Sequence, residues 1–252
     1  MAQYGFGSGI LWGVQSSNAA GAAIANPTPV RFGVLQDVSI DLSFTNKELH
    51  GGSQFPLAIG RGQGKIQGKA KFGQVNGALV NSLFFGQTLT VGQSLVANGE
   101  AATVPAATPW QITVANATTF AENLGVRYSS TGLPLTVVAS APAVGQYTVS
   151  AAGLYTFSTG DANAAVLIDY RYTAASTGSQ ITISNQLMGY APQFAADLLV
   201  PYGGKSMVLR LNACIGSKLS FMTKLDDFTI PEFDFEAFAD SANNIGTISF
   251  SE

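Results

Sequence analysis

Few residues in this chain are of types that carry out chemistry. His50 is the only histidine, so a Ser-His-Asp relay could form only around it, yet it lies in a glycine-flanked segment without a nucleophile motif. The glycine-rich run 60–65 superficially matches a phosphate-binding loop, but its first glycine is misplaced and Ile66 stands where Ser or Thr should bind magnesium. We therefore interpret His50 as an ordinary exposed histidine and the run as the entrance to a strand. The sequence predicts no catalytic residue.

A row of carboxylates near the C-terminus is the most regular chemical pattern. Glu232, Asp234 and Glu236 alternate with apolar residues, and alternate residues of a strand project to the same side about 7 Å apart. Three interpretations remain open. The row is a solvated strand face, or a calcium site that lacks the usual glycine-bent loop of closely spaced ligands, or, if repeated around a ring, a wall that repels the phosphates of DNA.

The remaining composition excludes several classes of site. Cys214 is the single cysteine, which rules out an internal disulfide framework and a cysteine-based zinc site, and its apolar surroundings predict a small buried hydrophobe. No metal-binding or cofactor-binding residues are predicted. The N-terminal segment lacks a positively charged start followed by an apolar block, and no apolar run approaches the roughly 18 residues of a membrane span. We therefore expect a chain that folds in a reducing cytoplasm and does not enter a membrane.

The charge balance points to association rather than to nucleic-acid binding. Twelve basic residues stand against 15 acidic ones, and charged residues make up 11% of the chain, compared with about 25% in a typical soluble protein. A protein that grips phosphates needs clustered Lys and Arg, and this acidic balance argues against such a function. With a net charge of only −3, copies repel one another weakly, which favours an oligomer.

The elements that position these residues are mostly strands. Strict alternation from Val34 to Phe44 places Asp37 and Asp41 on one strand face and apolar residues on the other. Gly60 to Phe72 alternates again, with lysines on one face, so an antiparallel pairing would bring those lysines close to Asp37 or Asp41. Further strand-like runs follow at Ile181–Leu187, Gln193–Val200, Ser206–Ile215, Lys218–Lys224 and Ile245–Phe250.

One helix and one inserted domain complete the predicted organisation. Val75–Phe85 has apolar residues at helical spacing, and Gly86 follows as a cap. Short strand-like segments separated by Gly, Pro, Ser and Asn between 91 and 180 predict a small inserted β-sandwich, so that the core comprises 1–90 and 181–252. Residues 1–29, rich in Gly, Ala and Ser, predict an extended N-terminal arm.

Several stretches of this sequence resemble one family of phage proteins. They are VRFGVLQDVSIDLSFTNKELHGGSQFPLAIGRGQGKIQGKAKFGQVNGALVNSLFFG at 30–86, KLDDFTIPEFDFEAFADSANNIGTISFSE at 224–252 and FGSGILWG at 6–13. These segments are similar to the major tail tube proteins of long-tailed bacteriophages. The resemblance covers the two ends of the chain and not the predicted insertion.

The resemblance implies an antiparallel β-sandwich or half-barrel with one flanking α-helix. Six copies would join their sheets into a ring, and the stacked rings would form a negatively lined tube through which genomic DNA passes without specific binding. The expected partners are further copies, the tape measure protein and the tail initiator and terminator proteins. The expected location is the virion tail, after assembly in the host cytoplasm, and the insertion would decorate the outside.

The resemblance also assigns expected roles to individual residues. The loop from Thr45 to Pro56 and the N-terminal arm would make ring-to-ring contacts. The lumen-lining candidates are Asp37, Asp41, Glu232, Asp234 and Glu236. The ring-to-ring candidates are Lys47, Glu48, His50, Phe55, Tyr4, Phe6 and Trp12, and the candidates for joining sheets between subunits are Lys65, Lys69 and Lys71.

Three other functions fit parts of the same pattern. A capsid decoration or fibre subunit would share the low charge and the β-strands, although a fibre should show internal repeats and none is found. A carbohydrate-binding β-sandwich could stack sugars on Trp12, Trp110 and tyrosines. An enzyme would have to rely on carboxylates alone, in a cleft that alternating strand faces do not suggest.

Overall fold

The structure is a computed structural model that describes residue 5, residues 7–74 and residues 76–251. The fold is mainly β, with 56% strand and 6% helix in antiparallel sheets, which confirms the predicted fold class. Contacts divide the chain into two compact units. Unit 1 comprises 1–89 and 181–252, and unit 2 comprises 90–180.

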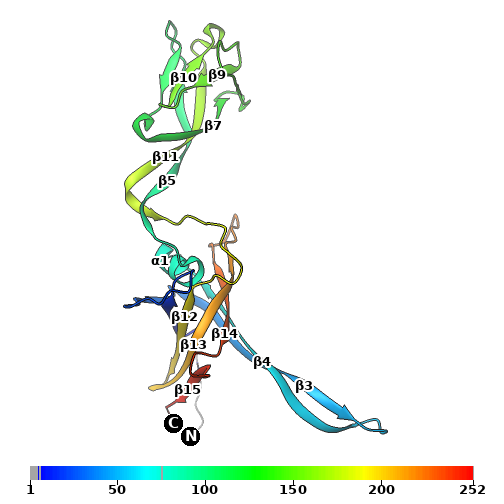
Figure 1. Cartoon of the computed structure of the whole chain (residues 1–252). Helices are drawn as coiled ribbons and strands as arrows, with labels where there is room; N and C mark the ends of the chain where they lie inside the picture. The colour runs from blue at the N-terminus through cyan, green and yellow to red at the C-terminus, as the bar shows by residue number, and fades with distance from the viewer. Residues whose placement is uncertain (1–4, 6, 75, 252) are drawn as a thin grey trace. The chain divides into compact units, whose positions relative to one another are not determined.

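Unit 1 is built on one eight-stranded antiparallel sheet (Figure 1). The strand order is β2-β1-β12-β13-β14-β4-β3, and β15 pairs with β13 beyond the end of β14. The strands are β1 Ile10–Ser17, β2 Pro29–Arg31, β3 Leu35–His50, β4 Pro56–Phe72, β12 Gln193–Tyr202, β13 Lys205–Ser220, β14 Glu232–Phe238 and β15 Gly246–Phe250. Strands from both ends of the sequence therefore lie side by side in one sheet.

Aromatic side chains fill the core of unit 1. Phe233 and Phe235, the apolar partners of the carboxylate row, are each 1% exposed and pack against Phe194. Gly68 lies opposite Phe235 on β4, where an added Cβ would stand 2.1 Å from the Phe235 ring. The alternation predicted for these strands is therefore the alternation between core and charged surface, and it requires a glycine at one position.

The predicted helix covers the core. It begins at Gly77, runs as α1 Gly77–Val80 and continues as a π-helical turn, η1 Asn81–Phe85; Val75 lies outside the described residues. The side chain of Asn76 accepts a hydrogen bond from the Ala78 N–H, and Gly86, with φ 60°, ends the helix. Its buried residues Leu79, Val80 and Leu83 belong to the core cluster of unit 1.

Several predicted elements are corrected by the structure. Residues 181–187, predicted as a strand, form none, and the two runs predicted at 206–215 and 218–224 are a single strand, β13, that ends at Ser220. The interval 45–56 is not mainly a loop, because β3 continues to His50 and β4 starts at Pro56, which leaves only a short turn. The interval 1–29 is not an arm throughout, because β1 pairs with both β12 and β2 inside the sheet. The Gly-, Ala- and Ser-rich residues around β1 concealed this short strand. Gly13 within it is buried against Leu83, where an added Cβ would stand 2.4 Å from that side chain.

Residues 41–65 of β3 and β4, with their connecting turn, leave the core as a two-stranded ribbon (Figure 1). We call this ribbon the arm; it is distinct from the N-terminal segment 1–29. From Asp41 to His50 on β3, and from Leu57 to Lys65 on β4, every residue is exposed. No further described strand pairs with β3. A ribbon of two strands is marginally stable in water unless it packs against something else.

Unit 2 contains two sheets around its own core. The sheets are β6-β10-β9-β8 and β5-β11-β7, with β5 Thr90–Thr103, β6 Gln111–Thr113, β7 Phe120–Tyr128, β8 Thr136–Val137, β9 Gln146–Val149, β10 Leu154–Phe157 and β11 Ala165–Gln180. Two short 3-10 turns, η2 Ala117–Thr119 and η3 Thr159–Asp161, connect strands. Tyr147 and Tyr155 from one sheet and Tyr170 from the other are buried together.

The close contact between Gly68 and Phe235 gives a first prediction. Replacing Gly68 with Ala should lower the free energy of unfolding by about 1–3 kcal/mol, because the extra methyl group overpacks the core. Chemical denaturation of the purified protein measures this. Gly52→Ala is the matched control, since an added Cβ there meets no atom within 4 Å. Equal stability of the two variants would contradict the packing argument.

Candidate functional site

The sheet of unit 1 gathers the charged residues of four strands on one face. Strand register places Asp37, Lys71 and Glu232 directly opposite one another on β3, β4 and β14. The same register brings Lys69 beside Asp234. We call the resulting surface the charged ladder; it consists of Asp37, Asp41, Lys65, Lys69, Lys71, Lys218, Glu232, Asp234 and Glu236. All five predicted lumen-lining residues therefore share one face.

Ion pairs run across the charged ladder. Lys69 and Lys218 both contact the carboxylate of Glu232, at 2.8 and 3.0 Å. Lys65 contacts Glu236 at 3.0 Å, and Lys71 lies 3.8 Å from Asp37. The three lysines predicted to join sheets between subunits thus each pair with a carboxylate of their own chain.

Glu232 is the centre of this network. Its side chain is 10% exposed, and the hydrogen bond from Lys69, with that from Lys218, lowers the pKa of its carboxyl below the usual value. The same hydrogen bond to Glu232 raises the pKa of Lys69. Both groups therefore stay charged over a wide pH range.

The ladder is close to neutral rather than strongly negative. Its five carboxylates face four lysine ammonium groups, which leaves one net negative charge for each copy of the chain. Asp41 takes part in no ion pair, and Oδ1 of Asp234 is buried without a hydrogen-bond donor. Both line a cavity of about 200 Å³ together with Ser39, Gln67 and Ser217. Among the described residues, no group of three or more His, Cys, Asp and Glu side chains is arranged to hold a metal ion.

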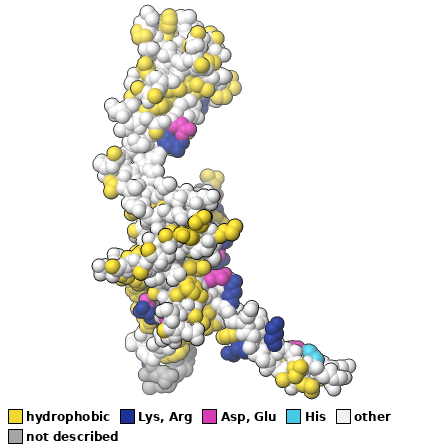
Figure 2. Space-filling model, viewed as in Figure 1, with side chains coloured by type: hydrophobic (Ala, Val, Ile, Leu, Met, Phe, Trp, Pro, Cys, Tyr) yellow, Lys and Arg dark blue, Asp and Glu magenta, His cyan; other side chains and the backbone are white. Residues whose placement is uncertain are grey.

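The opposite face of the same strands is apolar near the core and continues onto the arm, where Asn46, Glu48 and Arg61 also lie on it. Val38 and Ile40 pack against the core, and alternation carries this face along β3 to Leu42 and Phe44. Register places Ile59 of β4 beside Glu48 on that same face, beyond a one-residue bulge. The exposed apolar residues of the arm are Leu42, Phe44, Leu49, Phe55, Leu57 and Ile59. Figure 2 shows hydrophobic side chains gathered near the end of the arm.

Most of the predicted ring-to-ring residues lie on the arm. Lys47, Glu48 and His50 are exposed on β3, with a Glu48–His50 contact of 3.1 Å, and Phe55, in the turn, is 79% exposed. Trp12 lies instead in β1, opposite Arg31 of β2 and partly buried. Tyr4 and Phe6 lie outside the described residues.

The two tryptophans do not form open stacking platforms. Trp12 occupies an inner strand of the sheet and is partly buried. Trp110 packs against the core of unit 2, and its Nε1 is buried without a hydrogen-bond partner. Neither arrangement matches the exposed ring face that sugar stacking requires.

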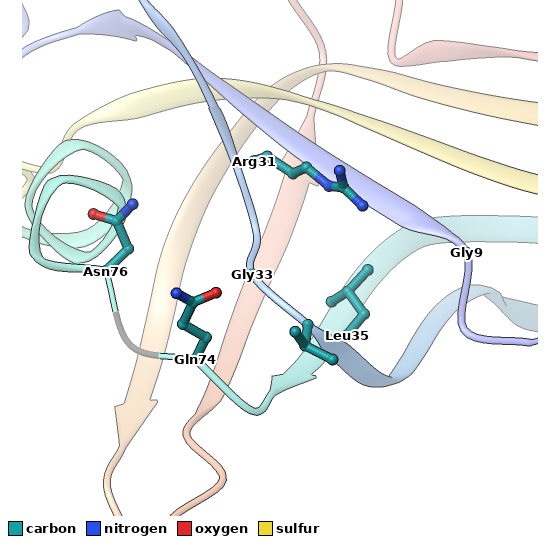
Figure 3. A pocket seen from close by; sticks show the side chains of 7 residues that line it. Gly9, Arg31, Gly33, Leu35, Gln74 and Asn76 are labelled. Carbon is teal, nitrogen blue, oxygen red and sulfur yellow. The ribbon is translucent and has the colours of Figure 1, made fainter.

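Two surface features escaped the sequence patterns. The first is the connection 221–231 between β13 and β14, where Leu225 is 98% and Phe228 88% exposed. The second is a cavity of about 530 Å³, lined by Gly9, Arg31, Gly33, Val34, Leu35, Gln74 and Asn76 (Figure 3). Its residues come from three separate segments, so only the folded chain brings them together.

Comparison with known proteins does not assign the chain to a family. No protein-family model matches it, and no curated protein is significantly similar to it. In the part of the chain that the structure describes, none of the helices has the length and apolar character needed to cross a membrane.

The lowered pKa of Glu232 gives a prediction on pH. The free energy that its ion pairs contribute should be fully present above its ordinary pKa of about 4.5 and should disappear as the pH falls through the lower pKa of the folded state. Glu232→Gln should therefore flatten the acid side of the stability profile, measured by thermal melting between pH 6 and about pH 3. Asp41→Asn, which removes a carboxylate without an ion pair, should leave that profile unchanged. A wild-type acid slope in Glu232→Gln would refute this role.

Proposed function

We propose that this chain is a structural virion protein of the tail tube type. Copies assemble into hexameric rings, and the rings stack into a tube that conducts DNA. The observation that carries the proposal is the arm, because its apolar face continues the face that packs into the core of unit 1. The proposal is structural rather than catalytic, and the resemblance of the two chain ends to tail tube proteins supplies the hexamer and the stacking.

The exposed apolar face of the arm favours a protein partner. Large exposed apolar side chains gathered on one element of a soluble protein often mark an interaction site. Leu57, which is 71% exposed, and Ile59 extend this surface towards the turn with Phe55. A second copy of the chain is the simplest partner, because one subunit type then covers every arm in a symmetric assembly.

Open strand edges favour the same conclusion. In the described sheet, β3 is an end strand and β15 pairs only with β13, so each presents an unpaired edge. Such edges associate with other strands unless they are covered. Joining the sheets of neighbouring copies around a closed ring would remove these edges while using a single kind of subunit.

The charged ladder is suited to line the lumen. A strongly basic lining would bind DNA phosphates tightly, in a manner that depends on salt. On the ladder, lysines are already paired with carboxylates and one net negative charge remains. A lining of this kind gives DNA little to bind to, and its weak negative charge opposes adhesion.

Electron microscopy of the arm variants tests the proposed function. The wild type should form rings or hollow tubes at high concentration, whereas Leu57→Asp with Ile59→Asp should remain monomeric, because both side chains would carry charge into the buried contact. Negative-stain images and light scattering report the assembly. Leu133→Asp, at an exposed leucine of unit 2, is the matched control and should assemble normally. Compact trimers or fibres of the wild type would favour a decoration or fibre subunit instead.

The separate cores of the two units predict that unit 2 is dispensable for assembly. The ends of unit 2, Thr90 and Gln180, pair with each other, and Oγ1 of Thr90 donates to the Gln180 carbonyl at 3.1 Å. Replacing residues 91–179 with a short turn should therefore leave unit 1 folded and able to form rings, as seen by circular dichroism and electron microscopy. A folded deletion variant that fails to assemble would instead place unit 2 in the subunit contact.

A further inference from the structure

Almost every charged side chain in the described residues has a partner within the chain. Ion pairs, hydrogen bonds or ring contacts involve all but five of them. The exceptions among these residues are Arg31, Asp41, Lys47, Lys205 and Asp226. A chain with so few charges seldom leaves one unpaired, so an unpaired charge that also lines a cavity or a complementary surface is a candidate for a contact outside its own subunit.

Arg31 lines the cavity of about 530 Å³. The other polar side chains of its lining are the amides of Gln74 and Asn76, and no carboxylate is among the described lining residues. Oδ1 of Asn76 already accepts the Ala78 N–H, so the amide nitrogen remains as a donor. Figure 3 shows Gln74 and Asn76 on the segment before α1, and Arg31 with its guanidinium pointing towards Gly9 on the other side of Gly33. This set of donors is suited to an anionic group.

Val34 and Leu35 give the same cavity an apolar wall. Val34 is 60% exposed, whereas its neighbour Leu35 is buried. A ligand that combines a carboxylate with an apolar group would therefore match the cavity better than a bare anion.

The turn between β13 and β14 has that combination. We call residues 224–228 the acidic turn; its ends are held by a β-bridge and a 3.5 Å ion pair between Lys224 and Asp227. Asp226, which has no ion pair, lies between Leu225 and Phe228, the two largely exposed apolar residues of the turn. The turn presents one free carboxylate between two apolar side chains.

The acidic turn and the cavity lie at the same end of the sheet of unit 1. The turn leads into β14, where Glu232 is opposite Lys71, and the Phe72 N–H donates to the Pro231 carbonyl. Phe72 in turn is opposite Leu35, which lines the cavity. A cyclic ring joins two different patches of the same subunit. The acidic turn and the cavity are two patches with complementary chemistry, and a ring axis running along the strands would place them at equal heights.

We propose that the acidic turn of one copy inserts into this cavity of the neighbouring copy, where Arg31 binds Asp226 and Leu225 or Phe228 packs against Val34. This inference deepens the proposed function and rests on self-association of the chain. It names a contact that joins subunits side by side, separate from the arm.

Charge reversal tests this contact in the full-length protein. Arg31→Glu and Asp226→Arg should each raise the concentration needed for oligomers by about tenfold or more, and the double variant should restore it to within about threefold of the wild type. Light scattering across a concentration series gives these values. Lys205→Glu makes the same charge change at another unpaired cation and should have little effect. Restoration in the double variant is the decisive result, because a folding defect would not be repaired.

Crosslinking provides a second measurement. Val34→Cys with Leu225→Cys should give a ladder of disulfide-linked oligomers on mild oxidation, whereas either single variant should stop at dimers. Cys214 can remain in place, because burial raises the pKa of its thiol to about 12 and keeps it unreactive.

The outcomes separate this inference from the proposed function. Normal rings in both single reversals would refute the contact and leave the tube intact. Paired loss and rescue in compact dimers, without rings, would support the contact and refute the tube. Binding of inorganic phosphate by Arg31, with no effect of Asp226→Arg on association, would identify the cavity as a small-anion site and overturn the proposal.

Discussion

The structure depends on one alternating face of β3 and β4 that packs into the core of unit 1 and then continues, exposed, along the arm. On β3 and β4, the residues on the same sheet face as Phe233 and Phe235 pack into the core of unit 1. On the arm, the residues of that face are exposed. Between Phe44 and Asn46 the register shifts, and β4 has one extra residue there. This bulge places Ile59 on the same face as Phe44. The core of unit 1 is buried while the same face stays exposed on the arm, and in the proposed assembly further copies would cover that exposed face.

The other face of these strands shows how a low-charge protein uses its few charges. Glu232 holds two lysines, and neighbouring pairs extend the network across β3, β4, β13 and β14. Cross-strand ion pairs of this kind also specify register, because a shift by one residue would move every charge into the core. Register and electrostatics therefore support each other, and the cost is that few charges remain for contacts with other molecules.

The two units have separate cores and carry different surface features. Unit 1 takes strands from both ends of the sequence and carries the arm, the charged ladder and the open strand edges. Unit 2 has its own core of stacked tyrosines, and its two ends are paired strands. A domain inserted through adjacent ends leaves the surrounding sheet continuous, so unit 1 and unit 2 can each keep a complete core in one chain.

The sequence by itself determined the local features: the mainly β fold, the alternation that separates charge from core, the helix before Gly86 and the buried cysteine. These follow from periodicity and capping, which act between neighbouring residues. It misassigned β1, a short apolar run between segments rich in Gly, Ala and Ser, the outer half of β3, whose residues are exposed, and 181–187, which alternates without forming a strand. The alternation already placed lysines near Asp37, but only the tertiary structure decided that Lys69 and Lys218 meet at Glu232 and that Arg31 lines a cavity beside Gln74. Those facts depend on strand order and on contacts between distant segments, which no local pattern encodes.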